Sequence, residues 1–172
     1  AVVDDRLGEE LRRALDGAKP SSTLFIVASK TFTTQETMAN AEAAKKWGGR
    51  DFIAVTANVE AARAFGASEV LPLWDWVGGR YSVWSAVGLA AACAIGSGKF
   101  QEFLAGGHEI DKHFADAPLE KNVPVLMALC GVWNTNFLGA ATHAVLPYSN
   151  ALRLFPAYLQ QLEMESNGKR VD

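Results

Sequence analysis

The sequence has few cysteines and histidines, no excess of positive charge and no long apolar run. Its 172 residues include two cysteines and three histidines, too few for a disulfide framework, and their spacing fits no zinc motif. The formal net charge of −3 provides no basic surface for nucleic acid or an anionic membrane. The longest apolar run, Val83 to Ile95, is interrupted by Ser85 and is too short to span a bilayer. We therefore expect no metal, no nucleic acid and no membrane as a partner.

The two cysteines lie in apolar stretches. Cys93 and Cys130 are typical of small buried hydrophobic residues in a reducing compartment. The N-terminal stretch AVVDDRLGEELRR is charged and lacks the apolar segment of a secretory signal. We therefore expect a cytoplasmic protein with both cysteines buried and with Val83 to Ile95 forming a helix of the core.

What the sequence does contain is the pattern of an α/β fold. A hydrophobic content of 49% and a charged content of 20% are typical of a globular chain. Short apolar runs predict strands at 24–28, 52–56 and 70–74, and helical spacing with glycine stops predicts helices at 9–15, 33–47 and 60–65. Pro72 places the third strand at an edge or at its own end. Alternating strands and helices predict a parallel sheet, whose ligands bind at the carboxyl ends of the strands.

The second half of the chain is mostly helical. The predicted helices are 82–95, 100–114, 119–137 and 152–162, with a short strand at 144–146. Residues 123–133 are almost wholly apolar, which predicts a helix buried on most sides. Pro156 must either begin the last helix or kink it.

Residues 25–37, FIVASKTFTTQET, combine an apolar strand, a polar turn and the start of a helix. Thr33 and Glu36 have the spacing of a capping box, so the helix should begin at Thr33 with several backbone N–H groups facing the turn. These donors attract anions. The side chains that we expect to bind the anion are Ser29, Lys30, Thr31 and Thr34.

The ligand expected at this turn is a monophosphate. A nucleotide P-loop requires glycines, and residues 25–37 contain none. The alternative is that the hydroxyls and the lysine only cap a surface turn.

Two further polar stretches can carry chemistry. In WDWVGGRYS, residues 74–82, Gly78 and Gly79 permit close backbone approach, and Arg80 can stabilise an oxyanion. In QQLEMESNGK, residues 160–169, Gln161 and Glu165 share a helix face, and a partly desolvated Glu165 can act as a general base. The alternatives are a glycine turn with a solvated arginine, and a solvated carboxylate near a helix end.

Together these stretches resemble the glucose-6-phosphate isomerase family. The resemblance rests on ASKTFTTQET from Ala28, WDWVGGRYSVWSAVG from Trp74, DKHF at Asp111, the EKN-PV-LAL run from Glu120 and QQLEMESNGK from Gln160. It covers essentially the whole chain.

The resemblance implies a three-layer αβα sandwich with a parallel sheet, of the sugar-isomerase (SIS), flavodoxin-like type. It implies interconversion of glucose 6-phosphate and fructose 6-phosphate through a cis-enediolate, in glycolysis and gluconeogenesis, without a cofactor because the hydrogen moves as a proton. The implied phosphate ligands are Ser29, Lys30, Thr31 and Thr34. Gly79 and Arg80 face the reacting carbons, Gln161 positions the sugar and Glu165 is the base.

The resemblance also implies an internal fragment that spans parts of two SIS units. We expect residues 1–98 to be the remainder of a first unit, 99–139 to be connecting helices and 140–172 to start a second. The family's upstream glycine-serine turn, downstream histidine and downstream lysine have no counterpart among these residues, so we expect the piece alone to be inactive. Family members are homodimers. The alternative function is a non-catalytic SIS module that binds a sugar phosphate, but such a module has no use for Arg80 and Glu165 together.

Overall fold

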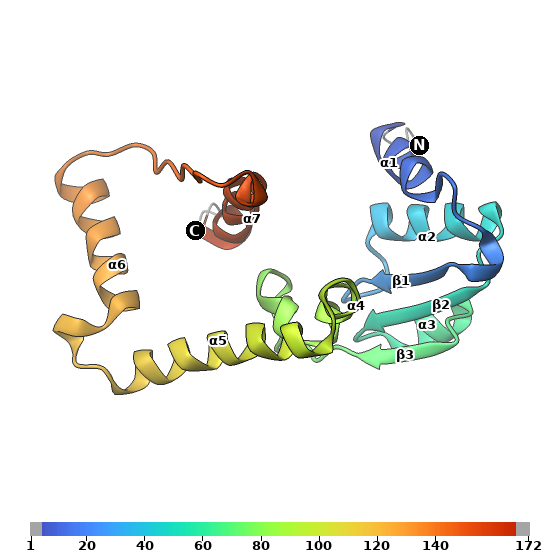
Figure 1. Ribbon diagram of the computed structural model, residues 1–172, viewed down its shortest axis with the longest axis horizontal. Helices are drawn as coiled ribbons and strands as arrows, with labels where there is room; N and C mark the ends of the chain where they lie inside the picture. The colour runs from blue at the N-terminus through green and yellow to red at the C-terminus, as the bar shows by residue number, and fades with distance from the viewer. Residues whose placement is uncertain (1–4, 168–172) are drawn as a thin grey trace. The chain divides into compact units, whose positions relative to one another are not determined.

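The computed structural model describes residues 5–167, with side chains for residues 8–164 (Figure 1). The chain divides into two units, Ala1–Ala94 and Ile95–Asp172.

The first unit is built on a three-stranded parallel sheet with the strand order β1-β2-β3 (Figure 1). Its elements are α1 (Asp5–Leu15), β1 (Leu24–Ala28), α2 (Gln35–Trp47), β2 (Asp51–Thr56), α3 (Val59–Phe65), β3 (Glu69–Pro72) and α4 (Leu89–Ile95), with 3-10 turns at Pro20–Ser22, Gly79–Trp84 and Ala86–Gly88. Phe25 pairs with Phe52, and Ala54 pairs with Val70. The predicted strands and their parallel order are confirmed, and Pro72 is the last residue of an edge strand.

Successive strand residues point to opposite faces of the sheet, and buried residues lie on both faces. On one face α2 and α3 pack against the strands; the buried residues there are Val27, Phe32, Ala41, Ala44, Phe52, Ala54 and Ala62. On the other face Val55, Leu73 and Val77 are buried, with Ala86 and Val87 packed against them. The α/β class is thus confirmed, and the architecture is consistent with the predicted αβα sandwich.

Three local predictions for the first unit are wrong. The helix α2 begins at Gln35 with Thr34 as its N-cap and no side-chain cap bond, because the Thr33 hydroxyl bonds the Thr31 hydroxyl instead. Residues 83–95 do not form one core helix. Ser85 is extended and accepts a hydrogen bond from the Val87 N–H, which separates two 3-10 turns. Cys93, expected to be buried, is exposed on α4.

The second unit consists of α5 (Ser97–Asp116), α6 (Val123–Val132) and α7 (Phe155–Asn167). Shorter turns are a 3-10 turn at Leu119–Lys121, a π-helical turn at Trp133–Phe137 and a 3-10 turn at Asn150–Leu152. Asn122 is 2% exposed and joins α5 to α6. Its side-chain oxygen caps Val125 N–H and its amide donates to the Phe114 carbonyl. The helices predicted at 100–114 and 152–162 are confirmed, whereas the one predicted at 119–137 is interrupted at Asn122, whose backbone is extended.

Other predictions for the second unit fail. Residues 144–146 form no strand, and the chain there is irregular. The apolar helix α6 is not buried on most sides: Met127 is 69% exposed and Leu129 is 59% exposed. A helix that is apolar all round needs neighbours on several sides, and within the described second unit α6 contacts chiefly α5 and the two turns that flank it. Cys130 on this helix is also exposed, contrary to expectation.

Pro156 begins α7 rather than kinking it, since it is the second residue of the helix. A proline is tolerated there because the first helical N–H groups have no intrahelical partner. Within residues 5–167, no helix combines the length and hydropathy needed to cross a membrane.

Candidate functional site

The polar turn that follows β1 gathers four hydroxyl groups. Ser29, which is 7% exposed, lies with its Oγ 2.9 Å from Thr34 Oγ1. Thr31 Oγ1 lies 2.7 Å from Thr33 Oγ1. The turn leads directly into α2, whose first N–H groups face it. Hydroxyl donors and a helix N-terminus therefore meet at the carboxyl end of a parallel strand, as the sequence predicted for Ser29, Thr31 and Thr34.

Phe32 gives this turn its shape. It has a φ of 56°, the one positive value found at a non-glycine residue in the described chain. Its side chain is 4% exposed and packs in the core with Phe65. The left-handed backbone costs roughly 1–2 kcal/mol, and burial of the ring offsets it. The ring points inward, so its threonine neighbours on either side remain at the surface.

The end of β2 holds the turn from the other side. The Lys30 carbonyl accepts hydrogen bonds from Ala57 N–H at 2.9 Å and from Thr56 Oγ1 at 3.0 Å. The amide of Asn58 donates to the Thr31 carbonyl at 3.2 Å, while its oxygen caps α3 at Ala61 N–H. Sequence reasoning missed these two supporting side chains. A Thr-x-Asn run between a predicted strand and helix was the available signal.

The side chain of Lys30 reaches the segment that carries Arg80. Its Nζ donates to the Asp75 carbonyl at 2.5 Å and to the Val77 carbonyl at 3.2 Å. Gly79 and Arg80 follow within three residues and open a 3-10 helix. The half-buried Arg80 places its guanidinium carbon 4.8 Å from the Tyr81 ring centroid. The structure thus links the first two polar stretches, 45 residues apart in sequence, at one end of the sheet.

The third polar stretch lies on α7, in the second unit. Gln161 is exposed on this helix. Glu165 falls in its last turn, and its side chain lies outside the described residues. The helix is continuous from Phe155 to Asn167, so the two residues are one turn apart on the same face.

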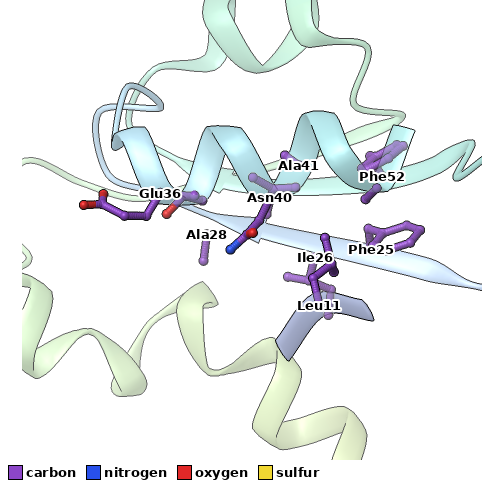
Figure 2. A pocket seen from close by; sticks show the side chains of 11 residues that line it. Leu11, Phe25, Ile26, Ala28, Glu36, Asn40, Ala41 and Phe52 are labelled. Atoms are coloured by element: carbon purple, nitrogen blue, oxygen red, sulfur yellow. The ribbon is translucent and has the colours of Figure 1, made fainter. Parts of the chain in front are cut away.

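A pocket of about 490 Å³ runs along the free edge of β1, between α1 and α2. Figure 2 shows Ile26 and Ala28 of β1 and Asn40 of α2 pointing to the side on which Leu11 of α1 lies. None of its described lining residues is basic. The pocket therefore does not suit an anion, and the polar turn is the better candidate for the site.

Comparison with known proteins agrees with these observations. The family model described as phosphoglucose isomerase matches residues 1–172, the whole chain. The chain belongs to the phosphoglucose isomerase family. It is 59% identical over 173 residues to a glucose-6-phosphate isomerase of Methylibium petroleiphilum, which covers 96% of this chain and 32% of that protein. A glucose-6-phosphate isomerase of Polaromonas naphthalenivorans is 58% identical, with 96% of this chain and 33% of that protein covered.

The solved structures agree. A crystal structure of a hypothetical protein from Thermus thermophilus matches with a TM-score of 0.71 and 27% identity, covering 95% of this chain and 42% of that one. The chain spans about a third of the length of the curated relatives that it matches.

The described part of the chain contains groups that can bind an anion. It offers hydroxyl donors, a helix N-terminus and the positive charge of Lys30 at one turn. Among the described residues, no group of three or more His, Cys, Asp and Glu side chains is placed to hold a metal ion.

Proposed function

We propose that this chain supplies part of the site of an aldose–ketose isomerase that interconverts glucose 6-phosphate and fructose 6-phosphate. The observation that carries the proposal is the link between the hydroxyl-rich turn and the Arg80 segment, made by Lys30 at the carboxyl end of the sheet. Membership of the phosphoglucose isomerase family supports it.

In this proposal the substrate phosphate binds at the turn after β1. The hydroxyls of Ser29 and Thr34 exchange the hydrogen bond between them for bonds to phosphate oxygens, and the Thr31 hydroxyl does the same with its bond to Thr33. Backbone N–H groups at the start of α2 add further donors. Lys30 supplies the positive charge that balances the phosphate.

The proton transfer needs a carboxylate and a fixed cation. Glu165 removes the proton from C2 of the open-chain aldose, and the electron pair forms the C1–C2 double bond as negative charge collects on O1. Arg80 stabilises that oxyanion, with Gly79 allowing close approach. The proton on O2 then moves to O1, the C2–O2 bond becomes the carbonyl, and Glu165 returns its proton to C1, which leaves the ketose. Gln161, on the same helix face as Glu165, positions the sugar.

The assembly that we propose follows from the same resemblance. Residues 1–98 are the remainder of a first SIS unit, 99–139 are connecting helices and 140–172 start a second. The protein acts in the cytoplasm as a homodimer, and its reaction serves glycolysis and gluconeogenesis.

The test uses solvent deuterium. A chimera is made in which these 172 residues replace the matching segment of the Methylibium petroleiphilum relative. Fructose 6-phosphate is incubated with it in heavy water, and deuterium at C1 is followed by NMR. We expect wash-in and turnover by the chimera, and neither by the 172-residue chain alone.

The decisive variant is Glu165→Gln, which removes the base and should abolish wash-in while fructose 6-phosphate still binds. The matched control is Glu163→Gln, an exposed carboxylate on another face of α7, which should leave turnover unchanged. Substantial wash-in by the Glu165→Gln chimera would remove Glu165 from the base role. A folded chimera that binds fructose 6-phosphate without wash-in would indicate a sugar-phosphate binding module instead.

A further inference from the structure

We infer that the Lys30 ammonium is a positioning group, which fastens the Arg80 segment to the phosphate turn and thereby couples phosphate binding to the reacting end of the sugar. This inference rests on the proposed function and adds a role for one residue within it. It differs from the simpler interpretation, in which the ammonium serves only as a direct ligand of the phosphate.

First, two of the three N–H donors of the Lys30 ammonium are already hydrogen-bonded to the segment that precedes Arg80. A lysine ammonium has three N–H donors and no acceptor. Two of them point to the carbonyls of Asp75 and Val77, at 2.5 and 3.2 Å from Nζ. Hydrogen bonds from a charged donor are about twice as strong as neutral ones. The side chain is therefore committed to this segment first, and one N–H is left for a ligand.

The second argument is the nature of the segment that Lys30 holds. Between the buried side chains of Leu73 and Val77, the residues Trp74, Asp75 and Trp76 are all exposed. The main chain is held here by hydrogen bonds from Leu73 N–H to the Thr56 carbonyl and from Val77 N–H to the Trp74 carbonyl. An exposed run of this kind depends on few contacts for its conformation. The two bonds from Lys30 fix it directly before Gly78 and Arg80.

The third argument is that Lys30 is itself fixed. Its carbonyl is held by Ala57 N–H and Thr56 Oγ1, at the end of β2. Backbone and side chain together connect the carboxyl ends of β1 and β2 with the segment that follows β3. A ligand that orders the turn at Ser29 and Thr31 therefore also orders the approach to Arg80, through one residue.

The substitution Lys30→Met tests the inference, because it keeps the length of the side chain and removes its donors. In this chain, we expect amide hydrogen exchange over residues 73–84 to rise roughly tenfold or more, since two charge-assisted bonds are lost. Lys45→Met is the matched control: Lys45 also donates to a carbonyl, that of Phe65, and carries the same charge. It should leave exchange over 73–84 unchanged.

Kinetics of the chimera separate positioning from direct binding. We expect Lys30→Met to lower kcat by roughly ten- to hundredfold and to weaken inorganic phosphate binding by a smaller factor, because the lost charge affects binding whereas the misplaced Arg80 affects the reaction itself. In a chimera that already carries Arg80→Ala, adding Lys30→Met should cost less than about threefold in kcat, because the group it positions is gone.

The opposite pattern would overturn the inference. If Lys30→Met weakens phosphate binding tenfold or more while exchange over 73–84 and kcat stay unchanged, the ammonium is a phosphate ligand only. Additive losses with Arg80→Ala would also refute the coupling. If the unsubstituted chimera fails to isomerise fructose 6-phosphate, the proposed function fails, and the exchange measurement still decides whether Lys30 holds the segment.

Discussion

Phe32 packs edge-on against Phe65, with ring centroids 5.7 Å apart, while its own backbone is left-handed. The candidate phosphate turn therefore takes its shape from a core contact. A residue with positive φ is more stable as glycine than as alanine, whereas elsewhere in regular structure alanine is favoured.

This relationship predicts an inverted order of stability. Phe32→Ala should lower the free energy of unfolding by about 3 kcal/mol, as for other buried phenylalanines. Phe32→Gly should be more stable than Phe32→Ala by about 1 kcal/mol. Urea unfolding measures both. At Phe52, in the middle of the sheet, we expect the usual order: Phe52→Ala should be more stable than Phe52→Gly. If Phe32→Gly is the less stable of its pair, the backbone strain does not contribute.

The Ser29 hydroxyl, paired with that of Thr34, should contribute measurably to phosphate affinity. Ser29→Ala should weaken inorganic phosphate binding about tenfold, because a hydrogen bond to a charged group contributes about 1.5–3 kcal/mol. Titration calorimetry on this chain measures it. Ser22→Ala is the control, since the Ser22 hydroxyl bonds the Lys19 carbonyl in an exposed turn. Equal affinities for all three proteins would place the phosphate elsewhere.

Asn58 has two roles that substitutions can separate: its oxygen caps α3 and its amide supports the turn. Asn58→Asp keeps the oxygen that caps Ala61 N–H but loses the amide that donates to the Thr31 carbonyl. It should change the free energy of unfolding by less than about 1 kcal/mol and weaken phosphate binding, because a carboxylate then lies beside the turn. Asn58→Ala should lose stability through the missing cap. Unchanged phosphate affinity in Asn58→Asp would mean that the turn does not depend on Asn58.

The buried Asn122 side chain should contribute strongly to the stability of the second unit. Asn122→Ala should lower the free energy of unfolding by about 2 kcal/mol, because it removes the α6 cap and leaves the Phe114 carbonyl of α5 without its donor. Asn122→Ser can restore the cap alone and should recover about half of the loss. Circular dichroism during denaturation measures both. A serine variant no better than alanine would show that the cap contributes nothing.

The Glu109–Lys112 pair should make the stability of α5 depend slightly on pH. The hydrogen bond from Lys112, whose Nζ lies 2.7 Å from Oε1, and then its charge lower the pKa of Glu109 below the ordinary value of 4.5. The pKa of Glu109 is lower in the folded chain than in the unfolded one. The Glu109–Lys112 pair therefore stabilises the fold above the unfolded pKa, and this stabilisation is lost as pH falls through the folded pKa. Lys112→Met should raise the pKa of Glu109, as followed by carboxyl NMR. Lys99→Met, which breaks the Lys99–Glu102 pair of the same helix, should not.

Much of the first unit could be predicted from sequence because its signals are local. Short apolar runs, glycine stops and Pro72 located three strands, and parallel pairing follows from the alternation of strands and helices. The turn at residues 29–34 was found for the same reason, since its hydroxyls and helix start are adjacent in the chain. The predicted start of α2 at Thr33 was wrong because the hydroxyls of Thr31 and Thr33 bond each other. A sequence pattern cannot decide between competing hydroxyl partners.

Burial could not be predicted in the same way. Apolar sequence around Cys93, Cys130 and residues 123–133 predicted buried side chains, yet both cysteines and most of residues 123–133 are exposed in the described chain. Hydropathy reports what a side chain favours, whereas exposure depends on which other elements pack against it.

By itself the sequence determined the class of fold, the parallel pairing of the strands and the chemistry available in each polar stretch. Only the tertiary structure decided that the Lys30 ammonium binds the carbonyls of Asp75 and Val77, that Thr56 and Asn58 support the turn, and that Phe32 is left-handed. Each of these joins or depends on residues distant in sequence. Local propensity acts within a few residues, while such contacts exist only once the sheet has brought the carboxyl ends of its strands together.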